Sequence, residues 1–340
     1  MTYIVKSSEK LRQSGAEGET KALLYLMNLR KDSNQIYYFI VDFFNDLTGM
    51  DRYSEKLWDV QSKSAKNNSA KAIGKELVTL FKNFISEFKF NDYILFVGGV
   101  ANSFRIDNNI TTFGIENIKK DAKEKMIVGL KEEAKIKTYI DNTAINDKQI
   151  NEFLQKVTFV IDDKESFEYI KLIIKNHPKI MPNNDVLQSI FNEIRNKQSE
   201  KKNSQVENKT ICSPDQALNF CRHLTTNEIR LLTLQRIINR NPVEKGIPKS
   251  FVPTYNSWPP EKNSEMLEEC QQSMCRALFN KNASDAFWTL FENVYDLILQ
   301  HQNYTVDKIF QSLDSDVKSA VPDLDVFSLK YFIANVKDGI

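Results

Sequence analysis

One run of residues constrains the fold more than any other. Residues 93–97, Tyr-Ile-Leu-Phe-Val, are apolar without interruption and are followed by two glycines. A strand with one face in water alternates apolar and polar side chains, whereas a strand buried on both faces does not. The run therefore predicts an interior strand of a sheet that is covered on both sides.

The residues before this run predict the elements that extend and cover the sheet. Residues 14–30 have the apolar spacing of a helix, and residues 35–44 are rich in β-branched and aromatic side chains, which favours a buried strand. A turn-like segment at 45–51 leads to a second strand at 56–64, so a hairpin is the economical interpretation. Residues 70–88 have the spacing of an amphipathic helix. The order helix, strand, strand, helix, strand predicts an α/β sandwich.

Lysines decorate the start and outer side of the helix expected at 70–88. They are Lys66, Lys71, Lys75 and Lys82. A solvated helix face is the favoured interpretation, over a role in contacting phosphate.

The strand at 56–64 carries a row of polar side chains. Successive strand side chains alternate between the two faces, so Asp59, Gln61 and Lys63 point to one side. A strand that only supported a sheet would place apolar residues there. One interpretation is an exposed edge strand protected by charge. The other is a working site that includes Asp46, which we expect near Gln61 and Lys63 where the two strands meet.

The first helix adds two candidate carboxylates. At 100° per residue, Glu19 falls near the middle of the apolar stripe and Glu17 falls on the far side. A carboxylate directed at the core needs a partner. Either residue could instead simply complement the positive N-terminal end of the helix, so the sequence leaves open which of them belongs to a site.

Together these side chains suit the hydrolysis of a phosphodiester. That reaction needs oxygen ligands for one or two Mg²⁺ ions and a cation near the attacking water and the phosphate. Asp46, Gln61, Lys63 and Glu19 supply these groups. An acid at the end of the first strand, followed by a ligand-x-Lys on the next, matches the PD-(D/E)xK nuclease pattern with glutamine in place of the middle acid.

Three short motifs carry a resemblance to a known family. The Gly-x-Glu-x-Glu start of the first helix, the Asn45-Asp46 turn and the strand at 59–63 resemble the Gln-x-Lys branch of these nucleases. In particular they are similar to the double-stranded DNA endonuclease domain of bacterial anti-phage effectors. That domain occurs fused to a SAVED ligand-sensing domain in CBASS effectors, and as the nuclease subunit of Lamassu-type systems beside an SMC-like ATPase. The resemblance covers about residues 10–100.

The resemblance implies a role for each residue. Asp46 would be the main metal ligand, and Gln61 would offer its amide oxygen as a neutral second ligand. Lys63 would orient the water and stabilise charge on the phosphate, while Glu19, or Glu17 as its substitute, would complete the site. The metal would be Mg²⁺, with Mn²⁺ able to replace it.

The resemblance also implies cutting of duplex DNA by an enzyme that is restrained until a partner or signal rearranges its nuclease domains. Glutamine at position 61 removes one negative charge and should weaken metal affinity, which Asp59 on the same face could offset. If the fold were kept and the chemistry lost, the chain would be a non-catalytic DNA- or protein-binding adaptor. The sequence leaves that alternative open.

A composition change divides the chain. Residues 196–210 have almost no apolar side chains and predict a linker, after which helical patterns continue to the end. We therefore expect a restriction-endonuclease-like α/β domain at 1–200 and an all-helical domain at 211–340. The second domain is too short and too helical for a SAVED fold, so we favour a Lamassu-like subunit. It would dock on an SMC-like ATPase or on another copy of the nuclease, forming a homo-oligomer when active.

Charge and hydropathy limit the remaining possibilities. The chain of 340 residues has 46 basic and 45 acidic side chains, so a DNA-binding surface must be local. No run of about 18 apolar residues occurs, which predicts no membrane segment. The first residues lack the apolar core of a secretory signal, so we expect a cytoplasmic protein. Four cysteines lie in the C-terminal part without a Cys-x-x-Cys pair, which disfavours a zinc site.

Overall fold

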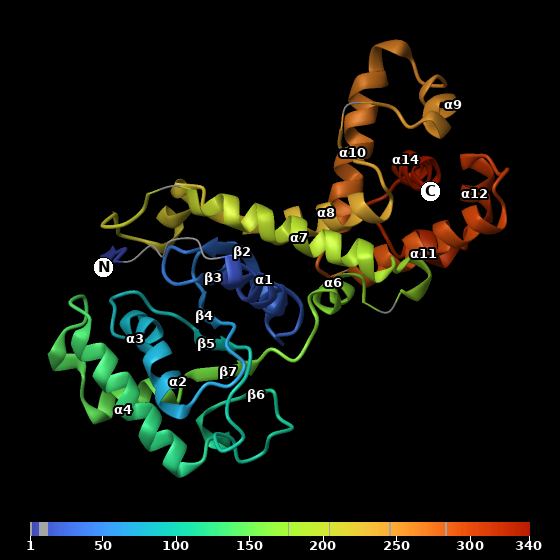
Figure 1. Ribbon diagram of the computed structural model, residues 1–340. Coiled ribbons are helices and arrows are strands. Elements are labelled where there is room, and N and C mark those ends of the chain that lie inside the picture. The colour runs from blue at the N-terminus through green and yellow to red at the C-terminus, as the bar shows by residue number, and fades with distance from the viewer. Residues whose placement is uncertain (1, 7–12, 176, 204, 245, 283) are drawn as a thin grey trace. The chain divides into compact units, whose positions relative to one another are not determined.

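The chain divides into two compact units, each described here by itself. The computed structural model describes residues 2–6, 13–175, 177–203, 205–244, 246–282 and 284–340 (Figure 1). Unit 1 comprises Met1–Tyr169 and Phe191–Thr226, and unit 2 comprises Ile170–Ile190 and Asn227–Ile340. These units place the boundaries elsewhere than the expected domains at 1–200 and 211–340.

A seven-stranded mixed sheet forms the centre of unit 1, in the order β6-β7-β5-β4-β3-β2-β9. Its strands are β2 (Ile36–Val41), β3 (Leu47–Asp51), β4 (Leu57–Lys63), β5 (Asp92–Val97), β6 (Thr112–Phe113), β7 (Val157–Ile161) and β9 (His223–Thr225). Strands β4, β5 and β7 are parallel, and the other pairs are antiparallel. The apolar run forms β5, an interior strand between β4 and β7, as predicted.

The predicted turn at 45–51 is wrong in its second half, because it contains β3. Strand β3 pairs with β2 as a hairpin and with β4 on its other side. Gly49, which reads as a turn residue, lies within β3 where a Cβ would come 3.1 Å from the Ile36 side chain and 3.2 Å from that of Leu26. Strand β4 is therefore interior, and the exposed-edge interpretation of its polar row is wrong.

Helices cover both faces of this sheet (Figure 1). Helix α1 (Gln13–Asn28) packs on one face, where its Tyr25 ring lies 5.9 Å from that of Phe96 in β5. The opposite face is covered by α2 (Ala70–Glu76), α3 (Val78–Phe84), α4 (Lys120–Ile136) and α5 (Asp147–Leu154). The single helix expected at 70–88 is thus two helices that meet at Leu77.

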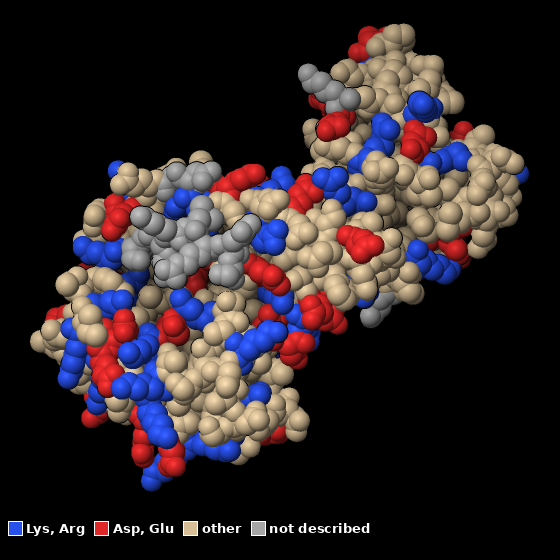
Figure 2. All heavy atoms as spheres, in the orientation of Figure 1, with Lys and Arg blue, Asp and Glu red and all other residues tan. Residues whose placement is uncertain are grey.

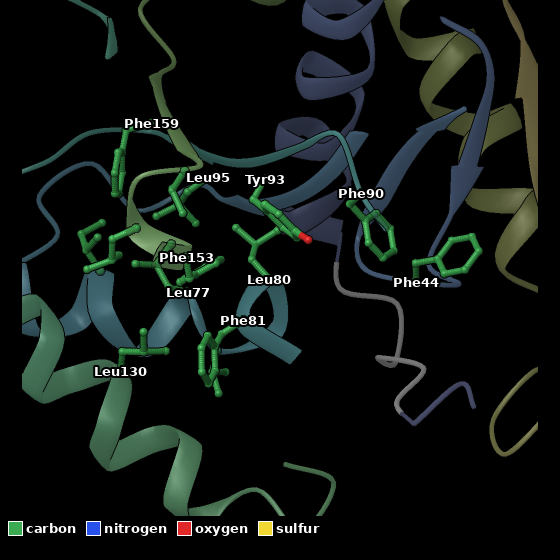
Figure 3. Close-up of a cluster of buried hydrophobic side chains, with 14 of the residues drawn as sticks. Phe44, Leu77, Leu80, Phe81, Phe90, Tyr93, Leu95, Leu130, Phe153 and Phe159 are labelled. Carbon is green, nitrogen blue, oxygen red and sulfur yellow. The ribbon is translucent and has the colours of Figure 1, made fainter. Parts of the chain in front are cut away.

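The second face holds a large apolar core. Figure 3 shows Leu77, Leu80, Phe81 and Phe153 in one cluster with Tyr93 and Leu95 of β5. These four side chains are all fully buried. Alternate positions of β5 are buried against α1 and against this core, which explains why its sequence is apolar throughout.

Residues 196–210 are not the predicted linker. Helix α7 (Asn184–Glu200) continues into a 3₁₀ helix (Lys201–Asn203), and β8 (Thr210–Ile211) pairs with β1 (Tyr3–Ile4). The few apolar residues here are used, since Val206 and Ile211 are buried. Polar composition suggested a linker, but two of these polar side chains make buried contacts with α1. Thr20 donates to Gln198 Oε1 at 2.8 Å, and Lys202 pairs with Glu19.

Helices are the only regular secondary structure in the described residues of unit 2. Besides parts of α6 (Ser166–Ile174) and α7, it contains α8 (Thr226–Ile237), α9 (Val252–Tyr255), α10 (Asn263–Phe279), α11 (Ser284–Gln300), α12 (Val306–Ser312), α13 (Ser315–Ser319) and α14 (Val326–Gly339). Helix α14 contacts α10, α11 and α12 and is buried along most of its length. None of the helices in the described chain is long and apolar enough to cross a membrane.

Candidate functional site

The polar row of β4 faces α2 and α3, and each member of the row has a partner there. The pairs are Asn83 Nδ2 with Asp59 Oδ2 at 2.6 Å, Thr79 Oγ1 with Gln61 Oε1 at 2.6 Å, and Lys63 Nζ with Glu76 Oε2 at 3.4 Å. Positions 76, 79 and 83 fall on one side of a helical period, so they form a polar stripe parallel to the row. Asp59 and Gln61 are buried, whereas the Lys63 side chain is 28% exposed.

Asp46 reaches this row from the loop between β2 and β3, as predicted. Its Oδ2 atom accepts hydrogen bonds from Gln61 Nε2 at 2.7 Å and from the backbone N–H of Ser62 at 2.8 Å. The loop is held in shape by Asp42, which has a positive φ of 47° and donates its backbone N–H to the Asp46 carbonyl. The tight return of the chain at 42–46 therefore fixes where the Asp46 carboxylate lies.

A small cavity of about 30 Å³ opens beside this contact. It is lined by Lys6, Asp42, Phe44, Asn45, Asp46, Gln61, Thr79, Lys82 and Tyr139. Such a volume exceeds the space that one water molecule needs. Two carboxylates, two amides, two hydroxyls and two ammonium groups thus line a space that could admit a metal ion or water.

The Asp46 and Gln61 oxygens can fit a hard divalent cation after one rotation. The Gln61 amide now turns its nitrogen toward Asp46, but a half-turn would present its oxygen at nearly the same place. Thr79 could follow, because its hydroxyl can accept from the amide as well as donate to it. Adjacent oxygen ligands of octahedral Mg²⁺ lie roughly 2.9 Å apart, given bonds of about 2.0–2.1 Å. The existing separation of 2.7 Å is close to that value.

Beyond these two residues, few carboxylates gather at the cavity. The described part of the chain contains no group of three or more His, Cys, Asp and Glu placed to hold a metal ion. Asp42 lines the same cavity, but Arg222 donates to its backbone carbonyl and lies 3.4 Å from its Oδ2. A cation here would depend on Asp46, neutral oxygens and water, which is typical of Mg²⁺ sites that keep several waters.

Asp59 is the most deeply buried charge of the row. Its side chain has no exposure to solvent, and Thr48 Oγ1 lies 3.4 Å from its Oδ1 in addition to the Asn83 contact. Burial raises the pKa of Asp59 to about 7, although the Asn83 hydrogen bond and Lys82 favour its charged form. Asp59 does not line the cavity, so it is not among the residues that could contact a cation there.

Lys63 faces a second and larger cavity of about 500 Å³. The cavity lies where β4, β5 and β7 end, and Glu17 of α1 lines it as well. Glu17 is half exposed, accepts a hydrogen bond from Ser166 at 2.9 Å and lies 3.5 Å from Lys21. Lys21 in turn pairs with Asp162 at 2.9 Å. Of the two helix carboxylates, Glu17 is the one brought to the same cavity as Lys63.

Glu19 is not brought to the Asp46 site. It points inward, as its place in the apolar stripe predicted, and pairs with Lys202 Nζ at 2.7 Å with only 12% of its side chain exposed. The Lys202 carbonyl accepts from Arg222 at 2.7 Å, and Arg222 reaches Asp42. The partner that Glu19 required is thus a residue of the segment that had been predicted as a linker.

Sequence reasoning missed four residues of the site: Asp42, Thr79, Lys82 and Asn83. The sequence did contain a signal for the helix residues of the site. Polar residues at 76, 79 and 83 form a stripe beside the apolar residues that the helix buries. Lys82 was interpreted as part of a solvated face, but its ammonium donates to the Phe44 carbonyl at 3.0 Å. No sequence pattern indicated Asp42, because its role depends on the loop geometry.

The side of unit 1 seen in Figure 2 has no continuous basic surface among its described residues. Figure 2 shows Lys and Arg side chains interspersed with Asp and Glu over unit 1. Surface ion pairs such as Lys71 with Glu132, at 2.8 Å, account for part of this mixture. The mixture leaves the described residues on this face of unit 1 without a continuous basic surface.

Comparisons with known proteins add no further constraint. No family model, no curated protein and no solved structure matches the chain.

Proposed function

We propose that this chain is a metal-dependent nuclease that hydrolyses phosphodiester bonds of double-stranded DNA. One observation carries the proposal, namely the contact of 2.7 Å between the Asp46 carboxylate and the Gln61 amide. It joins a loop and an interior strand at a cavity that could hold a metal ion with water. The order of helix, three strands, helices and strand in unit 1 supports the proposal, because a PD-(D/E)xK site would draw its residues from these elements.

Each side chain has a defined part in this proposal. Asp46 and Gln61 would hold Mg²⁺, or Mn²⁺ in its place, and the ion would polarise the phosphate and lower the pKa of a bound water. Lys63 would stabilise the charge that develops on the phosphate. Glu17, which lines the same larger cavity as Lys63, would be the substitute carboxylate from the helix. Glu19 would join the site only if its ion pair with Lys202 opened.

Internal contacts would restrain the proposed enzyme. Lys63 is paired with Glu76, Asp46 accepts two internal hydrogen bonds, and Glu19 is paired with Lys202. These contacts support the proposal that activity waits for a trigger. With the resemblance, they favour an effector of a bacterial anti-phage or anti-plasmid defence system of the Lamassu type. The helical unit 2 would bind an SMC-like ATPase or a second copy of the chain.

The same contacts favour one other candidate. If the row on β4 only fastens α2 and α3 to the sheet, the chain is a non-catalytic DNA- or protein-binding adaptor with a degenerate nuclease fold. The complete pairing of Asp59, Gln61 and Lys63 with helix side chains is the observation behind this alternative.

Plasmid cleavage in Mg²⁺ or Mn²⁺ separates the two functions. Because the pair of Lys63 and Glu76 is part-exposed and worth only about 0–1 kcal/mol, Glu76→Gln should remove this ion pair without unfolding the chain. We expect Glu76→Gln to cut faster than wild type. In that background Asp46→Asn should abolish cutting, and Lys63→Ala should slow it by roughly 10²–10³-fold.

Folding of each variant is checked by circular dichroism. Cleavage that persists in folded Asp46→Asn and Lys63→Ala protein would refute the site. An absence of metal-dependent cleavage from both wild type and Glu76→Gln would favour the adaptor.

A further inference from the structure

The small cavity beside Asp46 is lined by a lysine that does not belong to the ligand-x-Lys motif. Lys82 of α3 lines the small cavity together with Asp42, Asp46 and Gln61, whereas Lys63 lines the larger one. The Lys82 ammonium donates to the Phe44 carbonyl at 3.0 Å, two residues before Asp46. A lysine carries three donors, and this contact uses one of them.

Helix α3 delivers Lys82 as part of one face. Thr79, one turn earlier, donates to Gln61, and Asn83 donates to both Asp59 and the Phe44 carbonyl. The three side chains therefore reach the polar row and the β2–β3 loop from the same helical turn. Among the lysines once expected on a solvated face, Lys71 and Lys75 are exposed, but Lys82 is half-buried.

We propose that Lys82 is a second catalytic cation of the Asp46 and Gln61 site, positioned to bind the phosphodiester of the DNA substrate. This inference rests on the proposed nuclease function. It assigns Lys82 to the phosphate at the metal-sized cavity and leaves Lys63 to act from the cavity at the ends of β4 and β5. A cation placed in a partly desolvated site stabilises developing negative charge more than one in water does.

The surroundings of Lys82 change the pKa of its ammonium group. Burial lowers the pKa of Lys82 to about 8, while the Asp59 and Asp42 carboxylates oppose that shift. The ionisable groups that face it from the neighbouring elements are Tyr3, Lys6, Asp42, Asp46, Asp59 and Tyr139. If the charged ammonium is the acting form, cleavage should fall as the pH rises through about 8.

The test combines cleavage with chemical labelling. In the Glu76→Gln background, Lys82→Met should reduce the cleavage rate by roughly 10²-fold, and Lys82→Arg should recover part of the rate because it keeps the charge. Lys82→Arg should also move the alkaline limb of the pH profile to higher pH, since arginine stays protonated. Lys75→Met, on exposed α2, is the matched control and should leave the rate unchanged.

Labelling reports on Lys82 without requiring turnover. A short DNA duplex with Ca²⁺ in place of Mg²⁺ should protect Lys82, but not Lys75, from amine acetylation measured by mass spectrometry. Lack of protection would overturn the proposal, as would full cleavage by Lys82→Met when Asp46→Asn is inactive. Protection of Lys82 without any Asp46-dependent cleavage would keep Lys82 as a phosphate contact and refute the nuclease function instead.

Discussion

At the scale of single residues, the row on β4 shows how environment separates three similar positions. Asp59, Gln61 and Lys63 share one face, yet the first is fully buried, the second is at the edge of a small cavity and the third is partly in solvent. The alternation of a strand was enough to predict the shared face. The alternation could not predict that burial decreases from Asp59 to Lys63, because burial depends on the helices that cover the row.

The burial of Asp59 should make the stability of the protein depend on pH. The pKa of Asp59 is raised from 3.8 to about 7 by burial, so the folded state binds more protons than the unfolded state between these values. The free energy of unfolding should therefore fall as the pH rises from 4 to 8, by up to about 4 kcal/mol from this group. Asp59→Asn should remove that component, because asparagine can still accept from Asn83.

Urea unfolding of wild type and Asp59→Asn at pH 5 and pH 8 measures the effect. We expect the variant to gain stability relative to wild type at pH 8 and to gain less at pH 5. Parallel stability curves for the two proteins would show that Asp59 is not buried as a raised-pKa acid.

At the scale of elements, the sequence predicted the type of most segments but not how they pair. The interior strand β5 and helix α1 follow from apolar spacing, whereas the helical domain expected at 211–340 is helical only after β9 (His223–Thr225), which belongs to the sheet. Strand β3 was missed because its Thr-Gly and the preceding Asn-Asp read as turn signals. The segment at 196–210 was misjudged because polar residues that bond α1 look the same in sequence as polar residues in water.

The packing of α2 against α4 depends on two glycines. A Cβ on Gly74 would lie 1.9 Å from the backbone oxygen of Met126, and one on Gly129 would lie 2.1 Å from that of Lys71. The two helices can approach this closely only without side chains there. This contact fixes α2, which carries Glu76 and therefore sets the distance between Glu76 and Lys63.

Gly74→Ala should destabilise the protein by about 3 kcal/mol or more, at the upper end of overpacking effects, because backbone atoms cannot move aside as side chains do. Gly15→Ala is the matched control, since its Cβ would meet only Glu19 Oε1 at 3.6 Å. Thermal unfolding should show a large loss for the first variant and none for the second. Equal effects would mean that α2 and α4 are not in close contact.

At the scale of the whole molecule, the chain passes between the two units three times. It leaves unit 1 after Tyr169, returns within α7 after Ile190 and leaves again after Thr226. The returning segment supplies Lys202 and Arg222, which contact Glu19 and Asp42. Residues from outside the motif region thus pair with Asp42, which lines the Asp46 cavity, and with Glu19, which does not. The sequence could not reveal these contacts between distant segments.

The central claim is that Asp46 and Gln61 form a metal site. The most direct measurement is a crystal structure with Mn²⁺, with the metal located by its anomalous scattering and an Asp46→Asn crystal as control. We predict one Mn²⁺ between Asp46 and Gln61, with the amide turned so that its oxygen faces the metal and its nitrogen faces Thr79. A crystal with no Mn²⁺ at Asp46, or with the same metal peak in Asp46→Asn, would contradict the account.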